Sequence, residues 1–128
     1  VRTLSRLRDM QIHIAMDDFG TGYSSLSYIA RLPLSSVKID RSFVNAMRAS
    51  PQDRSIVSTI VALARSLDLT VVAEGVETRE ELDALRTMGC HEAQGFLFSR
   101  PVPAAAIEGL LRNDAVDCTM RNLAAPWQ

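Results

Sequence analysis

The sequence predicts an α/β fold with a parallel sheet. Four short apolar segments with strand-like patterns are separated by segments of helical periodicity, and this order repeats along most of the 128 residues. Polar side chains stand at or near the carboxyl end of each strand-like segment. The pattern fits either half of a closed barrel or a small open sheet, and it leaves both open.

The sequence pattern over residues 1–40 predicts two helices and two strands. Apolar residues recur at helical spacing from the first residues, as if the sequence begins inside an element, so we interpret the chain as a fragment. Alternating apolar residues from residue 11 onward predict a strand that stops at the glycine-rich segment 17–22. A capped helix is expected over 24–32, before Pro33, and a short strand over 37–40.

The second part of the chain predicts its longest helix over residues 53–67. Five apolar residues form a stripe along this helix: Ile56, Ile60, Leu63, Ala64 and Leu67. A third strand is expected over 70–73. Thr78, with Glu81 three residues later, has the spacing of a capping box, and Gly89 is expected to end the helix that this box begins.

Two elements and a tail are expected toward the carboxyl terminus. Residues 93–98 predict a fourth strand or an extended segment, and Pro103 is expected to start a last helix. Beyond residue 113 the pattern is polar and weak, which is typical of a frayed end. We therefore predict one folded portion over 1–113 and a tail over 114–128.

Composition limits the classes of function. A hydrophobic content of 47% predicts a packed core, and a net charge of -1 argues against binding a nucleic acid polymer. No apolar run approaches the ~20 residues that span a bilayer, so we expect no membrane contact by this segment. Cys90 and Cys118 do not form a zinc or disulfide pattern, which favours free thiols and a cytoplasmic location.

Two adjacent aspartates, Asp17 and Asp18, follow the first predicted strand and precede two glycines. Carboxylates are the hard oxygen ligands that Mg²⁺ and Mn²⁺ prefer, and glycines let the backbone approach a ligand. The alternative is that the pair forms a turn or caps a helix. Because the strand ends of α/β barrels assemble chemistry from several strands, we favour a metal site.

Four more polar residues lie near predicted strand ends: Lys38, Glu74, Glu77 and Gln94. Lys38 either lies on an exposed face or points into a site, where its charge would hold a water or a phosphate oxygen. Glu74 is a candidate general base or contact to a metal-bound water. The alternative for both glutamates, which we favour for Glu77, is placement near a helix N-terminus. Gln94 also fits a bulge or an edge strand.

Four segments are recognisable as a set. They are Asp-Asp-Phe-Gly-Thr-Gly-Tyr-Ser-Ser-Leu (17–26), Lys-Ile-Asp (38–40), Ala-Glu-Gly-Val-Glu (73–77) and Gln-Gly-Phe-Leu-Phe-Ser-Arg-Pro (94–101). In this order and spacing they closely resemble the second half of the EAL domain family. The resemblance implies the C-terminal part, about four βα units, of a TIM-like barrel. It also implies hydrolysis of cyclic di-GMP to linear pGpG with Mg²⁺ or Mn²⁺.

The resemblance assigns a role to each polar residue of these segments. Asp17 and Asp18 are similar to metal ligands, with Asp17 similar to the carboxylate between two ions. Lys38 is similar to the lysine that holds the attacking water. Glu74 is similar to the glutamate near that water, as a candidate general base or metal contact. Gln94 resembles the polar residue beside the scissile phosphate.

The resemblance also implies contacts between subunits. Glu77 is similar to the glutamate that anchors a loop beginning at Phe19, and this loop orders the metal site and the interface of a homodimer. Asp40 and the helix after Ser24 are then expected to contribute to dimerisation. A membrane anchor of the parent protein would lie in segments outside this sequence.

The sequence departs from the family in one large respect. The Glu-Ala-Leu motif that names the family is absent, as are the Asn and Glu ligands expected on the next strands. Two aspartates do not complete the coordination of two hard cations, so we expect the missing N-terminal half to be a partner and the fragment alone to be inactive. The alternatives are a receptor that binds cyclic di-GMP without hydrolysis, and a half-barrel with a structural role alone.

Overall fold

The computed structural model describes residues 2–20 and 29–112. Within these ranges the chain forms one sheet of four parallel strands: β1 (Ala15–Phe19), β2 (Ser36–Ile39), β3 (Thr70–Ala73) and β4 (Glu92–Ala93). Strands that follow one another in the sequence are neighbours in the sheet. The predicted parallel α/β arrangement is confirmed. A strand order without reversal is that of a barrel wall, because doubly wound open sheets reverse their order at a switch point.

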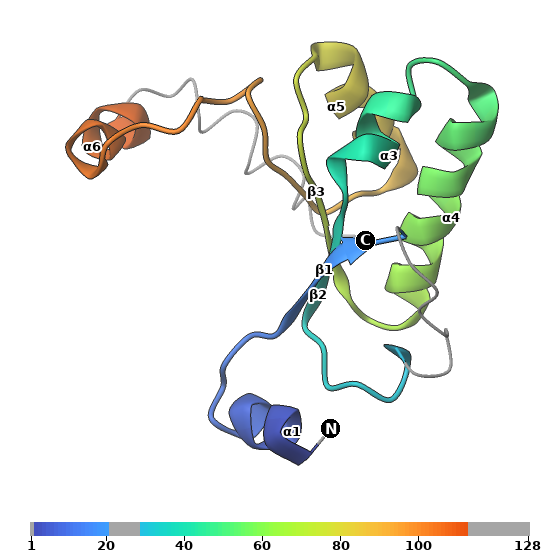
Figure 1. Cartoon of the computed structure of the whole chain (residues 1–128), viewed down its shortest axis with the longest axis vertical. Coiled ribbons are helices and arrows are strands. Elements are labelled where there is room, and N and C mark those ends of the chain that lie inside the picture. The colour runs from blue at the N-terminus through green and yellow to red at the C-terminus, as the bar shows by residue number, and fades with distance from the viewer. Residues whose placement is uncertain (1, 21–28, 113–128) are drawn as a thin grey trace.

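Helices cover one face of this sheet (Figure 1). The helices are α1 (Arg2–Asp9), α3 (Arg41–Ala46), α4 (Pro51–Ser66), α5 (Arg79–Met88) and α6 (Ala104–Arg112). α3, α4 and α5 lie together on one side, whereas α1 and α6 lie away from this layer and bury no residue. Among the described residues, no helix has the length and apolar character needed to cross a membrane.

The core lies between the sheet and the helix layer. In β2 the buried residues are Val37 and Ile39, and in β3 they are Val71 and Ala73. These side chains pack against α4, while the alternating position Lys38 belongs to the opposite face of the sheet. The face that a barrel would enclose therefore carries the lysine.

The structure corrects the predicted face of the longest helix. Val57 and Val61 are buried in the core together with Ile60 and Ala64, whereas Ile56 is 44% exposed. The predicted stripe was wrong at its N-terminal end. Ile56 and Val57 are adjacent apolar residues, so the sequence allowed either one to lie on the buried face of the helix. The helix also starts earlier than predicted, at Pro51, because Ser50 caps it by accepting hydrogen bonds from the N–H groups of Gln52 and Asp53.

Other boundaries also differ from the sequence prediction. The six-residue helix α3 was not predicted, since it is too short to show a helical period. Its N-cap is Asp40, whose carboxylate accepts hydrogen bonds from Ser42 and is held by them at a low pKa. β4 has two residues, shorter than the extended segment expected over 93–98. Most of the helix predicted over 24–32 lies outside the described residues.

The capping predictions around α5 are confirmed. Thr78 and Glu81 form a capping box at its start, and Gly89 ends it in the left-handed conformation with a φ of 83°. These contacts are local in sequence, which makes them readable without the fold. Five residues, 74–78, separate the end of β3 from the start of α5, so Glu74 occupies a short connection between the strand and the helix.

Candidate active site

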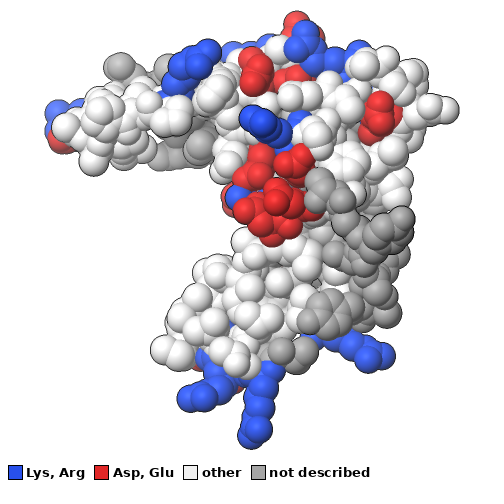
Figure 2. Space-filling view, in the orientation of Figure 1, with Lys and Arg blue, Asp and Glu red and all other residues white. Residues whose placement is uncertain are grey.

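The predicted site residues lie at one edge of the sheet. Asp17 and Asp18 are in β1, Lys38 is in β2, Glu74 directly follows β3, and Gln94 directly follows β4. Because all four strands are parallel, their carboxyl ends meet at the same edge. Figure 2 shows acidic side chains gathered on the concave side of the molecule. The fold thus brings together five of the six residues singled out from the sequence.

A bulge in β1 places the two aspartates side by side. Met16 pairs with Val37 and Phe19 with Ile39, so two residues of β1 stand opposite the single residue Lys38. Asp18 adopts a left-handed backbone with a φ of 52°. In a regular strand neighbouring side chains point to opposite faces, whereas a bulge redirects one of them. Both carboxylates can therefore serve the same site.

Lys38 contacts two of the three carboxylates around it. Its Nζ lies 3.0 Å from Oδ1 of Asp17 and also pairs with Oε1 of Glu74. The hydrogen bond to Glu74 and then that to Asp17 raise the pKa of Lys38 above its ordinary value. The ammonium group therefore keeps its proton at neutral pH and acts as a hydrogen-bond donor and positive charge.

Lys38 is the single lysine of the sequence, in which every other basic side chain except histidine is an arginine. An ammonium group is compact and donates in three directions, whereas a guanidinium group is planar and wider. The site thus carries the compact cation where three carboxylates converge. The sequence analysis did not use this count, although it is a signal that the sequence alone contains.

Glu74 is held by its neighbours on both sides. Oε1 accepts a hydrogen bond of 3.0 Å from Nε2 of Gln94. The backbone N–H of Glu74 donates to the carbonyl of Ile39 at 3.1 Å, and the N–H of Gln94 donates to that of Ala73 at 2.8 Å. Backbone bonds across the sheet thus fix where both side chains begin, and the side-chain bond fixes how they face each other.

The carboxylates of Asp17, Asp18 and Glu74 suit a divalent cation. One oxygen from each lies within 4.8 Å of the others. Hard cations such as Mg²⁺ and Mn²⁺ bind carboxylate oxygens and retain several waters, so three carboxylates fit the chemistry of such an ion. They do not supply enough ligands for two ions, which leaves coordination positions for water or for residues outside this chain.

Comparison with known proteins identifies the chain. The sequence model of the EAL domain matches residues 2–101. The chain belongs to the EAL domain family. Among curated relatives of this EAL chain, the cyclic di-GMP phosphodiesterase NbdA of Pseudomonas aeruginosa is 53% identical over 109 residues, which cover 85% of this chain and 14% of NbdA. The bifunctional diguanylate cyclase/cyclic di-GMP phosphodiesterase MucR of the same species is 54% identical over 101 residues, which cover 79% of this chain and 15% of MucR.

Solved EAL structures share the fold. The phosphodiesterase PaMucR in complex with c-di-GMP matches with a TM-score of 0.78 at 52% identity, covering 81% of this chain and 42% of PaMucR. The manganese and cyclic di-GMP complex of BlrP1 from Klebsiella pneumoniae matches with a TM-score of 0.71 at 43% identity, covering 78% of this chain and 26% of BlrP1. The expected C-terminal part of a TIM-like EAL barrel is thus confirmed as the fold. The chain spans about a seventh of the curated relatives and less than half of these solved EAL chains.

Glu77 is not part of the acidic cluster found among the described residues. Its side chain is exposed, and its backbone N–H donates to Oε2 of Glu81 at 2.8 Å. The loop that Glu77 is predicted to anchor begins at Phe19, but residues 21–28 of that loop lie outside the described residues. The anchoring role therefore stays a prediction. What the sequence analysis missed is the burial of Glu81, for which the capping-box spacing was the available signal.

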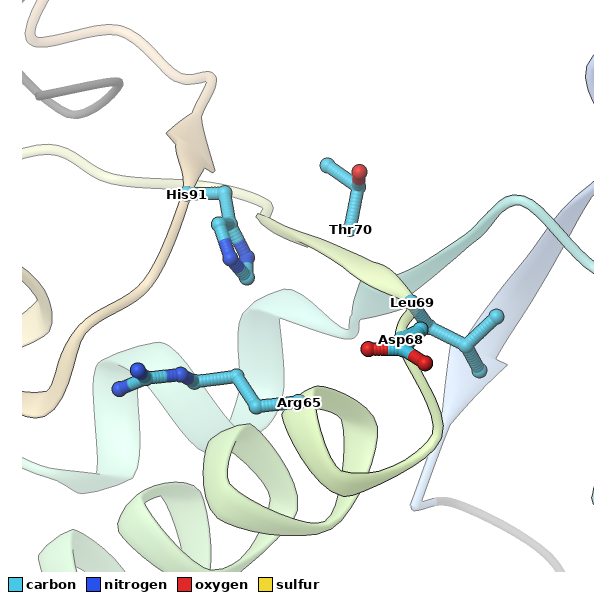
Figure 3. A pocket seen from close by; sticks show the side chains of 5 residues that line it. All are labelled: Arg65, Asp68, Leu69, Thr70 and His91. Atoms are coloured by element: carbon cyan, nitrogen blue, oxygen red, sulfur yellow. The ribbon is translucent and has the colours of Figure 1, made fainter. Parts of the chain in front are cut away.

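A pocket lies at the amino-terminal ends of β3 and β4, at the opposite end of the strands from the carboxylates. It has a volume of about 360 Å³ and is lined by Arg65, Asp68, Leu69, Thr70 and His91. Figure 3 shows the side chains of Arg65 and His91 on the same side of this space. Nδ1 of His91 accepts the backbone N–H of Val71 at 3.1 Å. Partial burial, and then the nearby charge of Arg65, lower the pKa of His91, which favours the neutral ring that accepts this hydrogen bond.

Proposed function

We propose that this chain is part of the active site of a metal-dependent cyclic di-GMP phosphodiesterase, which hydrolyses cyclic di-GMP to linear pGpG. The observation that carries the proposal is the convergence of Asp17, Asp18 and Glu74 around the single lysine at the carboxyl edge of the sheet. The proposal is supported by the relatives, since proteins about half identical to this chain are named as cyclic di-GMP phosphodiesterases.

Asp17 and Asp18 are the proposed metal ligands, with Glu74 as a further candidate contact. Bound Mg²⁺ or Mn²⁺ would supply activation of a water molecule and would offset charge on the phosphate. The carboxylates outnumber the ammonium group in the cluster, so it favours cations over a free phosphodiester. This explains why a chain of net charge -1 would need a metal to hold an anionic dinucleotide.

The remaining residues are proposed to handle the water and its proton. Lys38, whose raised pKa keeps it charged, would donate a hydrogen bond to the attacking water and could not accept its proton. Glu74 is the adjacent carboxylate and the proposed acceptor of that proton. Gln94 already donates to Glu74 through one amide proton, and its second amide proton is available to a phosphate oxygen.

The site is proposed to be split between this chain and the N-terminal half of an EAL domain. Three carboxylates leave the coordination of two cations incomplete. Within the described residues β1 and β4 are edge strands, whose open hydrogen-bonding groups favour pairing with further strands. We therefore propose that the chain alone is inactive, with the missing half and a second copy of the domain as its partners.

Three preparations test the proposal: this chain, this chain mixed with the missing N-terminal half, and a complete EAL domain that contains the chain. Hydrolysis of cyclic di-GMP is measured for each with Mn²⁺. We expect turnover only where both halves are present. In the complete domain, Asp17→Asn should abolish this turnover. If the complete domain binds cyclic di-GMP without hydrolysis in the presence of Mn²⁺, the receptor function replaces the enzyme.

A further inference from the structure

Glu81 is the only polar or charged residue that is buried in the described part of the chain, with 2% of its surface exposed. Its Oε2 accepts the backbone N–H of Glu77 at 2.8 Å and that of Thr78 at 3.0 Å. In return, Oγ1 of Thr78 accepts the backbone N–H of Glu81 at 3.3 Å. One carboxylate oxygen thus holds two successive backbone amides at the start of α5.

These two amides belong to the short connection that carries Glu74. On the strand side of the connection, the N–H of Val76 donates to the carbonyl of Gln94 at 3.0 Å. On the helix side, the N–H groups of Glu77 and Thr78 both depend on Glu81. Four residues after β3, the chain is therefore fixed by a buried side chain of α5. Only two residues separate Glu77 from Glu74, so a displacement of the backbone at Glu77 would also displace Glu74.

The burial of Glu81 exceeds what capping α5 requires. The Thr78 side chain already supplies the usual N-cap contact. Oε1 of Glu81 has no hydrogen-bond partner among the described residues, and its ion-pair partner, Nη1 of Arg48, lies 3.9 Å away. Burying a carboxylate oxygen that has no hydrogen bond opposes folding. Such a local conflict is expected where a residue serves function in addition to stability.

We propose that Glu81 is a positioning residue for Glu74. Its carboxylate holds the backbone at 77–78 so that Glu74 keeps its contacts with Lys38 and Gln94. This inference rests on the proposed function for its effect on catalysis. Its structural content concerns the orientation of Glu74, which can be measured without turnover.

Nuclear magnetic resonance on a complete EAL domain that contains this chain tests the orientation. The side-chain amide of Gln94 donates to Glu74, so its proton signals report where the Glu74 carboxylate lies. We expect these signals to move in Glu81→Ala and to stay in place in Glu81→Gln, since the amide oxygen of glutamine can accept both backbone N–H groups. Ser50→Ala is the matched control, because it removes an N-cap at another helix, where Ser50 accepts the N–H groups of Gln52 and Asp53 in α4.

Kinetics on a complete EAL domain that contains this chain tests the consequence. In Glu81→Ala we expect kcat to fall by about ten- to a hundredfold with little change in KM, because a small displacement of a reacting group is costly. Glu81→Gln should recover most of the rate, and Ser50→Ala should lower Tm without lowering kcat. If Glu81→Ala does not fold, Glu81→Asp replaces it, since the shorter side chain cannot reach both amides.

Two results would overturn the inference. One is a Glu81→Ala or Glu81→Asp variant that lowers Tm as Ser50→Ala does while kcat and the Gln94 signals stay unchanged. The other is an equal loss of kcat in Ser50→Ala, which would make the effect one of general stability. Absence of hydrolysis by the unmodified complete domain would count against the proposed function, while the Gln94 signals would still decide the positioning role.

Discussion

Gln94 donates a hydrogen bond of 3.0 Å to the Oε1 atom of Glu74, and the same oxygen pairs with the ammonium group of Lys38. One carboxylate oxygen therefore joins side chains from three adjacent strand ends. The backbone registers across β2, β3 and β4 make this possible, since they bring side chains that are far apart in the sequence into contact.

Removal of the Gln94 amide should reduce hydrolysis more than it reduces stability. In a complete EAL domain, Gln94→Leu keeps a similar volume but loses the donor to Glu74. We expect kcat to fall by about ten- to a hundredfold, the effect of one hydrogen bond to a charged group. Gln52→Leu, an exposed change in the first turn of α4, is the control. An unchanged kcat in Gln94→Leu would exclude a role for this bond.

Because Lys38 is the single lysine, carbon-13 labelling at the lysine ε position should give one signal. We expect it to titrate above the ordinary pKa of 10.5, since Glu74 and then Asp17 stabilise the charged form. The stability that these contacts contribute is fully present below the pKa of Lys38 in the unfolded chain. It is lost as the pH rises through the higher pKa of Lys38 in the folded protein. Glu74→Gln should lower the measured pKa, whereas the exposed change Glu80→Gln should not. Equal values in both variants would contradict the pairing.

The left-handed backbone at Asp18 predicts different effects for two substitutions. Asparagine tolerates this conformation, so Asp18→Asn should keep stability but weaken Mn²⁺ binding to the complete domain. Asp18→Val should destabilise by about 1–3 kcal/mol, because a β-branched residue is strained there. Asp68→Asn, at a φ of 54° and away from the site, is the control for both measurements. Unfolding in denaturant and electron paramagnetic resonance of Mn²⁺ provide the readouts.

Gly75 is required by its surroundings. Its φ is 72°, and a Cβ at this position would overlap the Cβ of Arg41 at the start of α3. We expect Gly75→Ala to destabilise the protein by about 2 kcal/mol or more, from backbone strain and overpacking. Gly109→Ala is the matched control, because nothing lies within 4 Å of a Cβ there and alanine favours the helix. Equal unfolding midpoints for the two variants would refute the packing argument.

The lowered pKa of His91 predicts that the protein loses stability in mild acid. Partial burial, and then the charge of Arg65, lower its folded pKa below 6.5, while Glu92 opposes the shift. Below pH 6.5 the unfolded chain binds more protons, so the free energy of unfolding should fall as pH decreases through the window between the two pKa values. His91→Asn can still accept the Val71 N–H and should remove this component. His13→Asn, at the other histidine, should leave it unchanged, and the comparison is made by thermal unfolding across this pH range.

Part of the site was predictable because its signals are local. Asp17 and Glu74 each directly follow an apolar strand-like segment, Lys38 lies within another, and Gln94 follows β4; parallel strands bring such residues to one edge. The resemblance to EAL domains rested on these same segments and is confirmed. The stripe on α4 was partly wrong, since Ile56 and Val57 compete for the same face and only packing against β2 and β3 selects Val57.

The sequence by itself determined the first three strands, the capped start and glycine end of α5, the family, and the polar residues that the fold brings to one edge of the sheet. These features depend on periodicity and on contacts between residues a few positions apart. Only the tertiary structure decided that a bulge sets Asp17 and Asp18 opposite one lysine, and that Glu81 is buried. The reason is physical: strand register and desolvation arise from pairing and packing of distant segments, such as Asp17 with Lys38.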